Sequence, residues 1–583
     1  MRLGAKWAIA LVCVLGVGAA ATYRWPVRSA NVESAVNQAI SSNLGLRLRR
    51  PASATFALLP WPTLRVVGVE LADAQEHSVL SAPTATFQLS IANLVRGKVV
   101  PRAAMLQSPT ALIDLDAIPA AAETDAHAPD DEEEPPALWS RVRLHAGVLH
   151  VVSASQGFDT LIESVEGSLD WPAGDRPLQL SVTGAWRDQS VAIEGTIDNP
   201  RNGLEGRSTG LRLDIAARPL SLKLDGVWSG GGGGGFTGDV AAQIHSLDAL
   251  QRLLGATSAL SVAGDALSIK GKMQTTSGSL QLSDSHFELA GQTLDGALTV
   301  ARQDERYAIS GSLAADSLRL DALLPVSPAP MTVDGQWSPL PFGFRPPRNV
   351  DLDLRLSIAH AIWLGHRIDD AAASLMCRDG RLALKLLEAT AYQGAMRGEL
   401  NLAEGAGGLE AQISGSLSDA DFGAAFADFG WSAYRGRGGL EFNLRSTGFT
   451  PSNAISSLTG AVSLDLQAGV VSGVSIEEAI RRSRRRPIDI PRDMTTGQTT
   501  FSRAHAQFDI AGGQATIRTA RVEGPGAVVS VEGAFDLAAR HLNARLVATQ
   551  ADGQGSPSVD AAKLTIVLSG PWSAPAVSTA PGG

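Results

Sequence analysis

The sequence predicts a mainly β protein, an elongated, twisted antiparallel sheet that forms a groove and is built from degenerate repeats. Two observations lead to this fold class. Apolar and polar residues alternate over many short stretches, and a five-residue box of the form apolar-x-Gly-x-apolar recurs along the chain. Period-two apolarity between glycine-containing breaks is typical of antiparallel strands with one half-buried face. An N-terminal transmembrane helix and a few short amphipathic helices complete the prediction.

The repeat is clearest at Asp379–Leu402, where Leu382, Leu384 and Leu386 alternate with other residues before the chain breaks at Gln393-Gly394. In each copy a Gly-led strand is followed by a closing box whose glycine lies 18 or 20 residues later. Further copies occupy Gly147–Leu169, Gly278–Leu298 and Gly513–Phe535, and lone boxes occur at Ile193–Ile197, Ile309–Leu313, Val333–Trp337 and Ile413–Leu417. A chain of 583 residues is longer than one hydrophobic core can organise. A repeat protein avoids this limit, because each repeat buries its apolar face against its neighbours alone.

Composition excludes several function classes. The net charge of −10 argues against nucleic acid as a partner. Only Cys13 and Cys377 occur, and Cys13 lies in the apolar N-terminal run, so neither an internal disulfide nor a cysteine metal site is expected. No feature of the sequence indicates a cofactor.

Residues 1–24 are predicted to form a single-pass anchor. Arg2 and Lys6 precede Trp7–Thr22, a run of 16 residues without a charge, which is near the lower limit for spanning a bilayer. The leading basic residues predict a cytoplasmic N-terminus and place the rest of the chain across the membrane. A cleaved signal peptide with a site at Ala19-Ala20-Ala21 is the alternative. Tyr23 and Trp25 favour the uncleaved anchor, because aromatic residues gather at membrane interfaces.

Asn31–Gly45 has the 3.6-residue apolar period of a short amphipathic helix. Such a helix either caps the first sheet layer or lies on the membrane. Capping is favoured because the stretch carries no Lys or Arg. Arg47, Arg49 and Arg50 follow and could meet lipid head groups.

The stretch Leu44–Asp73 resembles the opening of the AsmA family of bacterial envelope proteins. The resemblance continues through Ala85–Leu89, Asn93–Val99 and Leu106–Leu112, and it returns at Asp379–Asn401, Leu466–Ile480, Gly512–Leu537 and Leu564–Pro575. Between these parts it rests on the style of the repeats alone. It implies a twisted periplasmic β-groove that moves phospholipids between the inner and outer membranes and supports outer-membrane integrity and assembly.

Five regions follow from these patterns: the anchor (1–24), an AsmA-like N-terminal module (25–118), a linker (119–137), a β-repeat groove region (138–470) and an AsmA-like C-terminal module (471–583). The linker is acidic and rich in Pro and Ala, which is typical of a solvated segment. A calcium site there lacks the spaced ligands of an EF-hand loop. The Gly230–Gly235 run is predicted to be a flexible loop, because a phosphate cradle needs a following Lys-Ser/Thr.

Ser475–Arg486 is predicted to be a helix that opens with a Ser475-x-x-Glu478 capping box and stops at Pro487. It ends with five arginines, Arg481, Arg482, Arg484, Arg485 and Arg486. Positive charge at a helix C-terminus is favoured by the helix dipole. Five arginines are more than the helix dipole requires, so contact with anionic phospholipid or an acidic partner is the more specific interpretation. RNA is disfavoured because no aromatic residues accompany the arginines.

The sequence predicts no catalytic or metal site. His360 and His366 are six apart without a metal-ligand spacing, and the pairs Asp114/Asp116 and Asp351/Asp353 alternate with apolar residues, which favours a solvent face of a strand. No nucleophile elbow, P-loop or dinucleotide fingerprint occurs in a suitable context. We therefore expect a protein that is not an enzyme.

A long sheet with one apolar face and few helices needs a partner for that face. The groove interpretation predicts that phospholipid acyl chains slide along a floor that includes Leu382, Leu384 and Leu386. The same residues would line a dry, closed core equally well. The alternative function is a non-enzymatic scaffold or assembly factor for outer-membrane proteins that binds client strands at a sheet edge. Outer-membrane or periplasmic assembly proteins are the protein partners we expect.

Overall fold

The computed structural model describes residues 23–26, 47–49, 53–72, 78–96, 101–114, 141–153, 158–172, 176–204, 207–229, 235–254, 266–276, 278–303, 306–323, 329–348, 350–428, 432–473, 475–483, 497–551, 563–572 and 575–580. The predicted span Trp7–Thr22, the helix Asn31–Gly45, the linker 119–137 and all but the last residue of the Gly230–Gly235 loop lie outside these residues. Within them, no helix has the length and apolar character that crossing a membrane requires.

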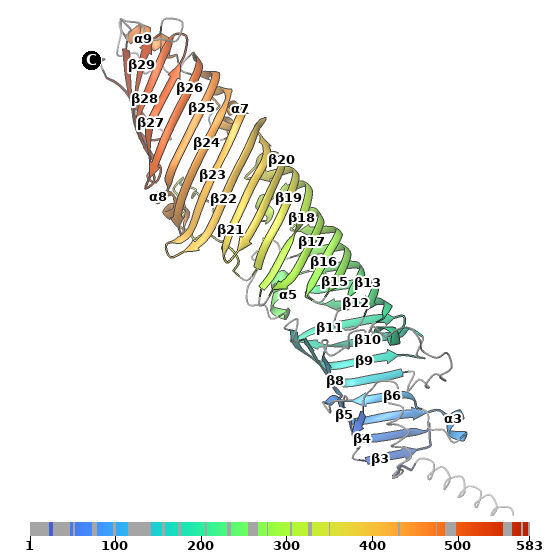
Figure 1. The fold of residues 1–583 in the computed structure, drawn as a ribbon. Coiled ribbons are helices and arrows are strands. Elements are labelled where there is room, and N and C mark those ends of the chain that lie inside the picture. The colour runs from blue at the N-terminus through green and yellow to red at the C-terminus, as the bar shows by residue number, and fades with distance from the viewer. Residues whose placement is uncertain are drawn as a thin grey trace, which may run out of the picture. The chain divides into compact units, whose positions relative to one another are not determined.

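The described residues are mainly β, as predicted, and belong to two compact units (Figure 1). The strands of unit 1 are β1 (Trp25–Pro26), β2 (Arg47–Arg49), β3 (Ser53–Ala57), β4 (Thr63–Ala72), β5 (Ser78–Leu89), β6 (Pro101–Gln107), β7 (Thr110–Asp114), β8 (Arg141–Ser153), β9 (Phe158–Asp170), β10 (Leu178–Trp186), β11 (Gln189–Ile197), β12 (Ser208–Ala217), β13 (Leu220–Ser229), β14 (Phe236–Ile244) and β15 (Leu267–Thr276). Its helices are α3 (Ile91–Val95), α4 (Pro200–Leu204) and α5 (Leu247–Leu254). Strand β16 (Ser279–Leu289) contains the boundary between the units.

The strands of unit 2 are β17 (Gln292–Gln303), β18 (Arg306–Arg319), β19 (Val350–Trp363), β20 (His366–Arg378), β21 (Arg381–Ala391), β22 (Gly394–Gly405), β23 (Gly408–Asp421), β24 (Tyr434–Gly448), β25 (Thr459–Ser472), β26 (Gln498–Ala511), β27 (Gln514–Glu523), β28 (Ala527–Asp536), β29 (His541–Gln550), β30 (Lys563–Pro571) and β31 (Ala576–Ala580). Its helices are α6 (Leu320–Leu323), α7 (Phe422–Asp428), α8 (Pro451–Ser456) and α9 (Ile476–Ser483). The few short helices also agree with the prediction.

Alternation of burial along the strands explains why these segments are β. In β10, Leu178, Leu180 and Val182 are half-buried, whereas the residues between them are exposed. Successive side chains of a strand point to opposite faces of the sheet, so this pattern gives the sheet one apolar face and one polar face.

Most neighbouring strands pair antiparallel, but the prediction of a wholly antiparallel sheet is wrong at two places. Strand β18 pairs in parallel with β19, and β8 pairs in parallel with both β6 and β7. A parallel pair needs a crossover connection, and long connections precede both β8 and β19: residues 115–140 and 320–349.

The closing boxes of the four spaced repeats lie in strands β9, β17, β22 and β28, and three lone boxes lie in β11, β18 and β23. The box Val333–Trp337 is the exception. It forms a turn in which the Gly335 N–H donates to the Thr332 carbonyl oxygen at 2.9 Å and Gly335 has a φ of 73°. Val333 is fully exposed. Prolines at 330 and 339 flank the box, and proline disfavours a central strand because it lacks an N–H.

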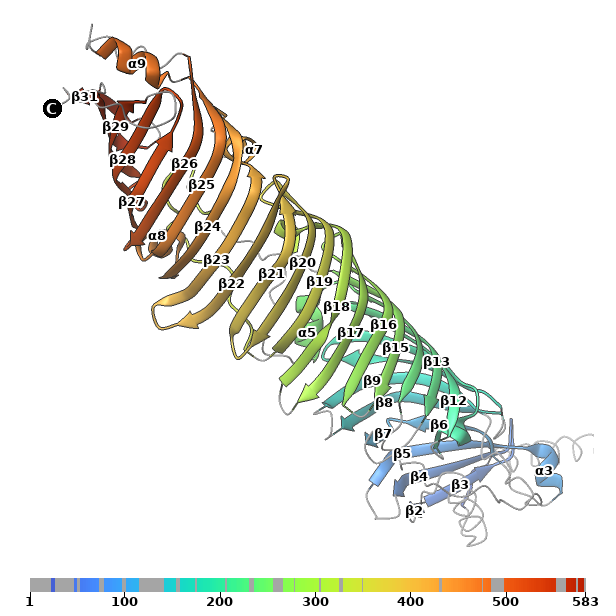
Figure 2. The same cartoon turned by 45° about the horizontal axis from the view of Figure 1, so that its top comes forward.

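Two helices of unit 2 pack against its apolar face near the ends of the strands that they contact, and Figure 2 shows both. Helix α9 contacts β26, β29 and β30 and buries Ala479 and Ile480 in a cluster with Ala527, Val529, Ala548, Leu564 and Ile566. Helix α7 contacts β24 and buries Phe422 and Ala425 in a second cluster with Ala420, Tyr434, Leu466 and Phe501. The start of α9 agrees with the predicted helix, and residues 484–496 lie outside the described part.

Candidate functional site

The three predicted floor residues lie on one face of one strand. Leu382, Leu384 and Leu386 belong to β21 and are each half-buried, whereas Lys385 and Leu387 point to the other face and are exposed. The structure therefore places the three leucines together on the apolar face of unit 2.

Cross-strand register extends this face over eight strands. The apolar row of unit 2 consists of paired residues on consecutive strands from β17 to β24: Leu298, Gly311, Leu354, Leu375, Leu384, Leu400, Ile413 and Leu444. Paired residues of a sheet share a face and lie side by side. Polar side chains are absent from this row.

The opposite face of the sheet carries a row of polar residues. The polar row of unit 2 pairs Ser312, Arg355, Ser374, Lys385, Glu399, Ser414 and Asn443 on strands β18 to β24. Each member is the chain neighbour of a member of the apolar row. A shift of register by one residue on any of these strands would mix the two faces, so the pairing itself creates the apolar surface.

Unit 1 repeats the arrangement. Its apolar row pairs Phe56, Leu64, Phe87, Ala104, Val142, Leu169, Leu180, Gly195, Leu213, Leu224 and Val240 on strands β3 to β6 and β8 to β14. Leu64, Phe87 and Ala104 are buried in a cluster that Leu94 of α3 joins. From Val142 to Leu224 the members of the row are half-buried.

The same contrast in burial occurs in unit 2. Seven members of its apolar row are half-buried, and Ile413 is 41% exposed. The side chains beneath α7 and α9, in contrast, are buried. A contiguous apolar face that the protein leaves half open is typical of a surface that receives a partner or an apolar ligand.

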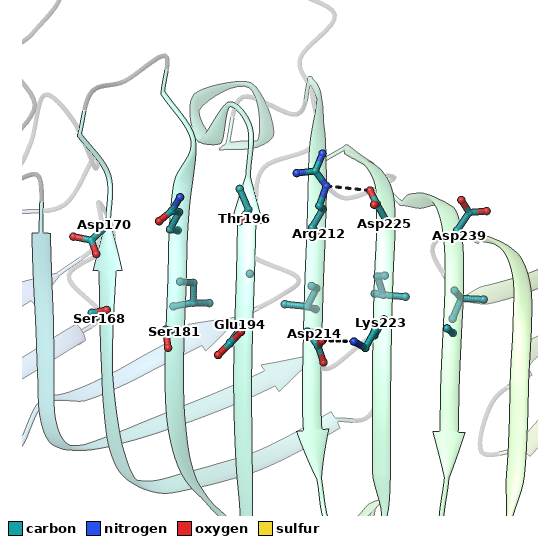
Figure 3. Close-up of a pocket in the computed structure, with 17 residues that line it drawn as sticks. Ser168, Asp170, Ser181, Glu194, Thr196, Arg212, Asp214, Lys223, Asp225 and Asp239 are labelled. Atoms are coloured by element: carbon teal, nitrogen blue, oxygen red, sulfur yellow. Dashed lines mark ion pairs between the residues drawn. The ribbon is translucent and has the colours of Figure 1, made fainter.

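The polar faces of the sheet carry hollows. One hollow of about 680 Å³ extends across β9 to β14 of unit 1 (Figure 3). Arg212 Nε lies 3.5 Å from Asp225 Oδ1 there, and Lys223 Nζ lies 3.0 Å from Asp214 Oδ2. Its charged lining comprises five carboxylates, Asp170, Glu194, Asp214, Asp225 and Asp239, and the two cations Arg212 and Lys223. This excess of carboxylates makes the hollow unsuitable for acyl chains and for anionic head groups.

The predicted arginine cluster is described only in part. Arg481 Nη2 lies 2.6 Å from Glu478 Oε2 one turn earlier on α9, and its side chain is 69% exposed. The Arg482 backbone belongs to α9, while its side chain and residues Arg484, Arg485 and Arg486 lie outside the described part. An exposed pair of this kind contributes little to stability, so Arg481 remains accessible to an anionic partner.

The polar residues considered as catalytic candidates contact different partners in the structure. His360 Nδ1 lies 2.8 Å from Asp369 Oδ1, and His366 Nδ1 lies 3.1 Å from Asp428 Oδ2, so the two histidines face different carboxylates. The half-buried Asp351 has Arg306 Nη1 3.6 Å away and Arg378 Nε 3.7 Å away, whereas Asp353 is exposed. Asp114 ends β7, and Asp116 lies outside the described residues. Among the residues that the structure describes, no three metal-ligating side chains converge.

Sequence reasoning missed a contact that joins α7 to strand β20 and to the turn after β21. Asp428 accepts hydrogen bonds from His366 Nδ1 and from the Tyr392 hydroxyl, which lies 3.0 Å away, and these hold the pKa of Asp428 below its usual value. Burial, with the nearby Asp428, raises the pKa of Tyr392 to about 12. The three residues come from α7, β20 and the turn after β21. No local spacing in the sequence indicates this contact.

Comparison with known families gives one match. The model of the AsmA family matches residues 215–520, which is just over half of the chain. The match includes residues 215–378, where the resemblance rested on repeat style alone, together with Asp379–Asn401 and Leu466–Ile480. It contains the whole apolar row of unit 2 and does not reach the stretches of resemblance between Leu44 and Leu112. No curated protein and no solved structure matches the chain.

Proposed function

This chain belongs to the AsmA family and is an envelope protein of the AsmA type, and we propose that it binds phospholipid acyl chains along the apolar faces of its sheet. In this proposal the chain moves phospholipids between the inner and outer membranes and thereby supports outer-membrane assembly and integrity. It acts without enzymatic chemistry.

The apolar row of unit 2 is the observation that carries the proposal. Leucine or another apolar residue, or glycine, recurs on eight successive strands and stays half open to solvent. Acyl chains match such a surface, because burying apolar area is favourable and has no directional requirement. The phospholipid head groups would stay in water at the margin of the face.

The energetics favour sliding over tight binding. Covering apolar surface stabilises by roughly 25 cal/mol per Å², so completing the burial of one half-buried leucine contributes on the order of 1 kcal/mol or less. A lipid that moves along the row exchanges one set of such contacts for an equal set. The proposal therefore needs a continuous row, and no single residue determines specificity.

The proposal places the chain in the inner membrane by one N-terminal span, with the N-terminus cytoplasmic and the body in the periplasm. The uncharged run Trp7–Thr22 after Arg2 and Lys6 supports this location. The arginines of Arg481–Arg486 would contact anionic head groups or a partner protein.

Native mass spectrometry of the purified full-length chain tests lipid binding. The expected result is several phospholipids bound to the wild-type chain and fewer bound to the Leu384→Asp/Leu386→Asp variant, because two carboxylates interrupt the apolar face. A matched control, Lys385→Asp/Ser414→Asp, alters the polar face beside the same positions and should leave the lipid count unchanged. Circular dichroism verifies that all three chains are folded. A folded wild-type chain without lipid would contradict the proposal.

A second candidate function has one observation in its favour. Among the described residues, β31 pairs with β30 on one side, which leaves a five-residue edge. An edge strand can accept a strand of another protein, as a scaffold or assembly factor for outer-membrane proteins requires. Such a scaffold would bind a client at this edge and carry no lipid on the apolar row.

A further inference from the structure

One end of unit 1 exposes a group of large apolar and aromatic side chains. This end patch consists of Tyr23, Trp25, Leu58, Leu59, Trp61, Ile91 and Val95, whose exposed fractions lie between 44% and 83%. Single exposed apolar residues are ordinary on protein surfaces, but a group of this size on one end marks an interaction surface.

Strand pairing brings the three segments of the end patch together. Trp25 pairs with Phe56 in the antiparallel ladder of β1 and β3, so Tyr23 lies toward Leu58. The Leu89 N–H donates to the Pro62 carbonyl oxygen at 2.8 Å, which holds the loop after β3 beside the start of α3. In Figure 1, α3 lies beyond the ends of β4 and β5.

The end patch has internal order. The rings of Tyr23 and Trp25 pack edge to face with centroids 5.3 Å apart. The side chain of Leu94 packs against the buried cluster of unit 1, while Ile91 and Val95 on the same helix point outward. One residue of α3 therefore fixes the helix on the sheet and leaves its other apolar side chains available to a partner.

The charged side chains that the structure describes at the end patch are basic. Arg24, Arg96 and Arg102 are exposed beside it. The described stretches that build this end, residues 23–26, 53–64, 87–96 and 101–106, contain no Asp or Glu. Exposed Trp and Tyr with flanking arginine is the composition that favours the interface of an anionic bilayer, because the aromatic rings prefer the headgroup level and the basic side chains are attracted to anionic lipid.

We propose that the end patch inserts into the interfacial layer of an anionic phospholipid bilayer and seats the first strands of unit 1 on the membrane. The sequence supplies an independent reason, because the uncharged run Trp7–Thr22 ends one residue before Tyr23. This inference rests on the membrane attachment in the proposed function, and it adds that the loop after β3 and helix α3 are themselves membrane contacts.

Site-specific fluorescence on the full chain tests the inference. In a Cys13→Ala/Cys377→Ala background, a single Trp61→Cys or Val95→Cys carries an environment-sensitive label, and the chain is reconstituted into vesicles of phosphatidylethanolamine and phosphatidylglycerol. The matched control is Trp363→Cys, because Trp363 is 48% exposed at the end of β19 in unit 2.

The expected result is a blue shift for the labels at 61 and 95, with quenching by spin-labelled lipid several-fold stronger than for the label at 363. Quenching of all three labels by aqueous iodide to the same extent, in chains that float with the vesicles, would overturn the inference and leave the proposed attachment intact. Chains that fail to float would overturn both.

Discussion

The glycines of the repeated boxes differ in what the neighbouring strand requires of them. A Cβ atom added at Gly533 would lie 2.2 Å from the Asn543 carbonyl oxygen, and Gly533 has a φ of 143°. At Gly398, which closes the repeat around β21, the nearest atom to an added Cβ would be the Ser414 carbonyl oxygen at 3.2 Å. The close approach of β29 therefore requires glycine at 533, while at 398 a methyl group would need the Ser414 carbonyl to give way by only a few tenths of an ångström.

We expect Gly533→Ala to destabilise the pairing of β28 with β29 by more than about 1 kcal/mol, since both the backbone conformation and the neighbouring carbonyl oppose a side chain. Gly398→Ala should change the pairing of β22 by less than that. Hydrogen exchange of the amides of both strands measures the difference. Equal loss of protection in the two variants would show that the close approach is not the cause.

Alternation alone predicts which face Leu382, Leu384 and Leu386 share, because these residues precede any irregularity in β21. The register then shifts between Leu386 and Ala389, and Ala389 and Ala391 become the buried residues of the strand. A β-bulge inserts one residue and moves the following side chains to the other face. No residue type in the stretch indicates this bulge, so the burial of Ala389 and Ala391, which alternation alone would place on the face of Lys385, could not be predicted.

Among the elements, helix α9 contributes to stability through its buried side chains more than through its surface charges. Ile480 is 2% exposed within its cluster, whereas Arg481 beside it is largely exposed. Ile480→Ala should destabilise the C-terminal strands by roughly 2–4 kcal/mol through the lost contacts and the cavity left behind.

Arg481→Ala is the matched control and should alter stability by less than about 1 kcal/mol. Hydrogen exchange in β29 and β30 gives both values. If the two substitutions had the same effect, the packing of α9 on the sheet would not be what stabilises this end of unit 2.

Helix α7 is joined to β20 through the contact of Asp428 with His366, and the Tyr392 hydroxyl donates to the same carboxylate. Because these hydrogen bonds lower the pKa of Asp428 in the folded protein, their stabilisation is complete above the unfolded pKa of about 4 and is lost as the pH falls through the lower folded value. We expect the protection of α7 amides, corrected for intrinsic exchange, to fall below pH 4.

The variant Asp428→Asn should show reduced protection already at pH 6 and no further fall below pH 4. A pH dependence equal to that of the wild type would assign the effect to another carboxylate.

Helix α8 shows a local sequence signal that is sufficient to predict where a helix begins. Thr450 and Pro451 open α8 with a threonine cap, whose Oγ1 accepts from the Asn453 N–H at 3.2 Å, and a proline at the first turn. This signal was available from the sequence. Val333–Trp337, in contrast, matches the strand box in composition, but prolines and the Gly335 turn determine its structure. A five-residue pattern is too short to determine the local structure when the flanking residues favour a turn.

For the whole molecule, repeat spacing and alternation predict the mainly β class and the division of each strand into an apolar and a polar face. The parallel pairings of β8 and β19 depend on where long connections return the chain, which local patterns do not encode. The apolar rows depend on register summed over many strands. Residues as distant in sequence as Leu298 and Leu444 belong to one row only because every intervening pairing is in step.

Photo-crosslinking in living cells tests the central claim, that lipid occupies the apolar face, most directly. A photoreactive phenylalanine analogue replaces Leu384, Leu400 or Leu444 of the apolar row, and Lys385, Glu399 or Asn443 of the polar row serve as controls in the full chain. We predict phospholipid adducts by mass spectrometry at the three apolar positions and none at the three polar ones. Adducts at equal levels on both faces, or protein adducts alone at the apolar positions, would contradict the account.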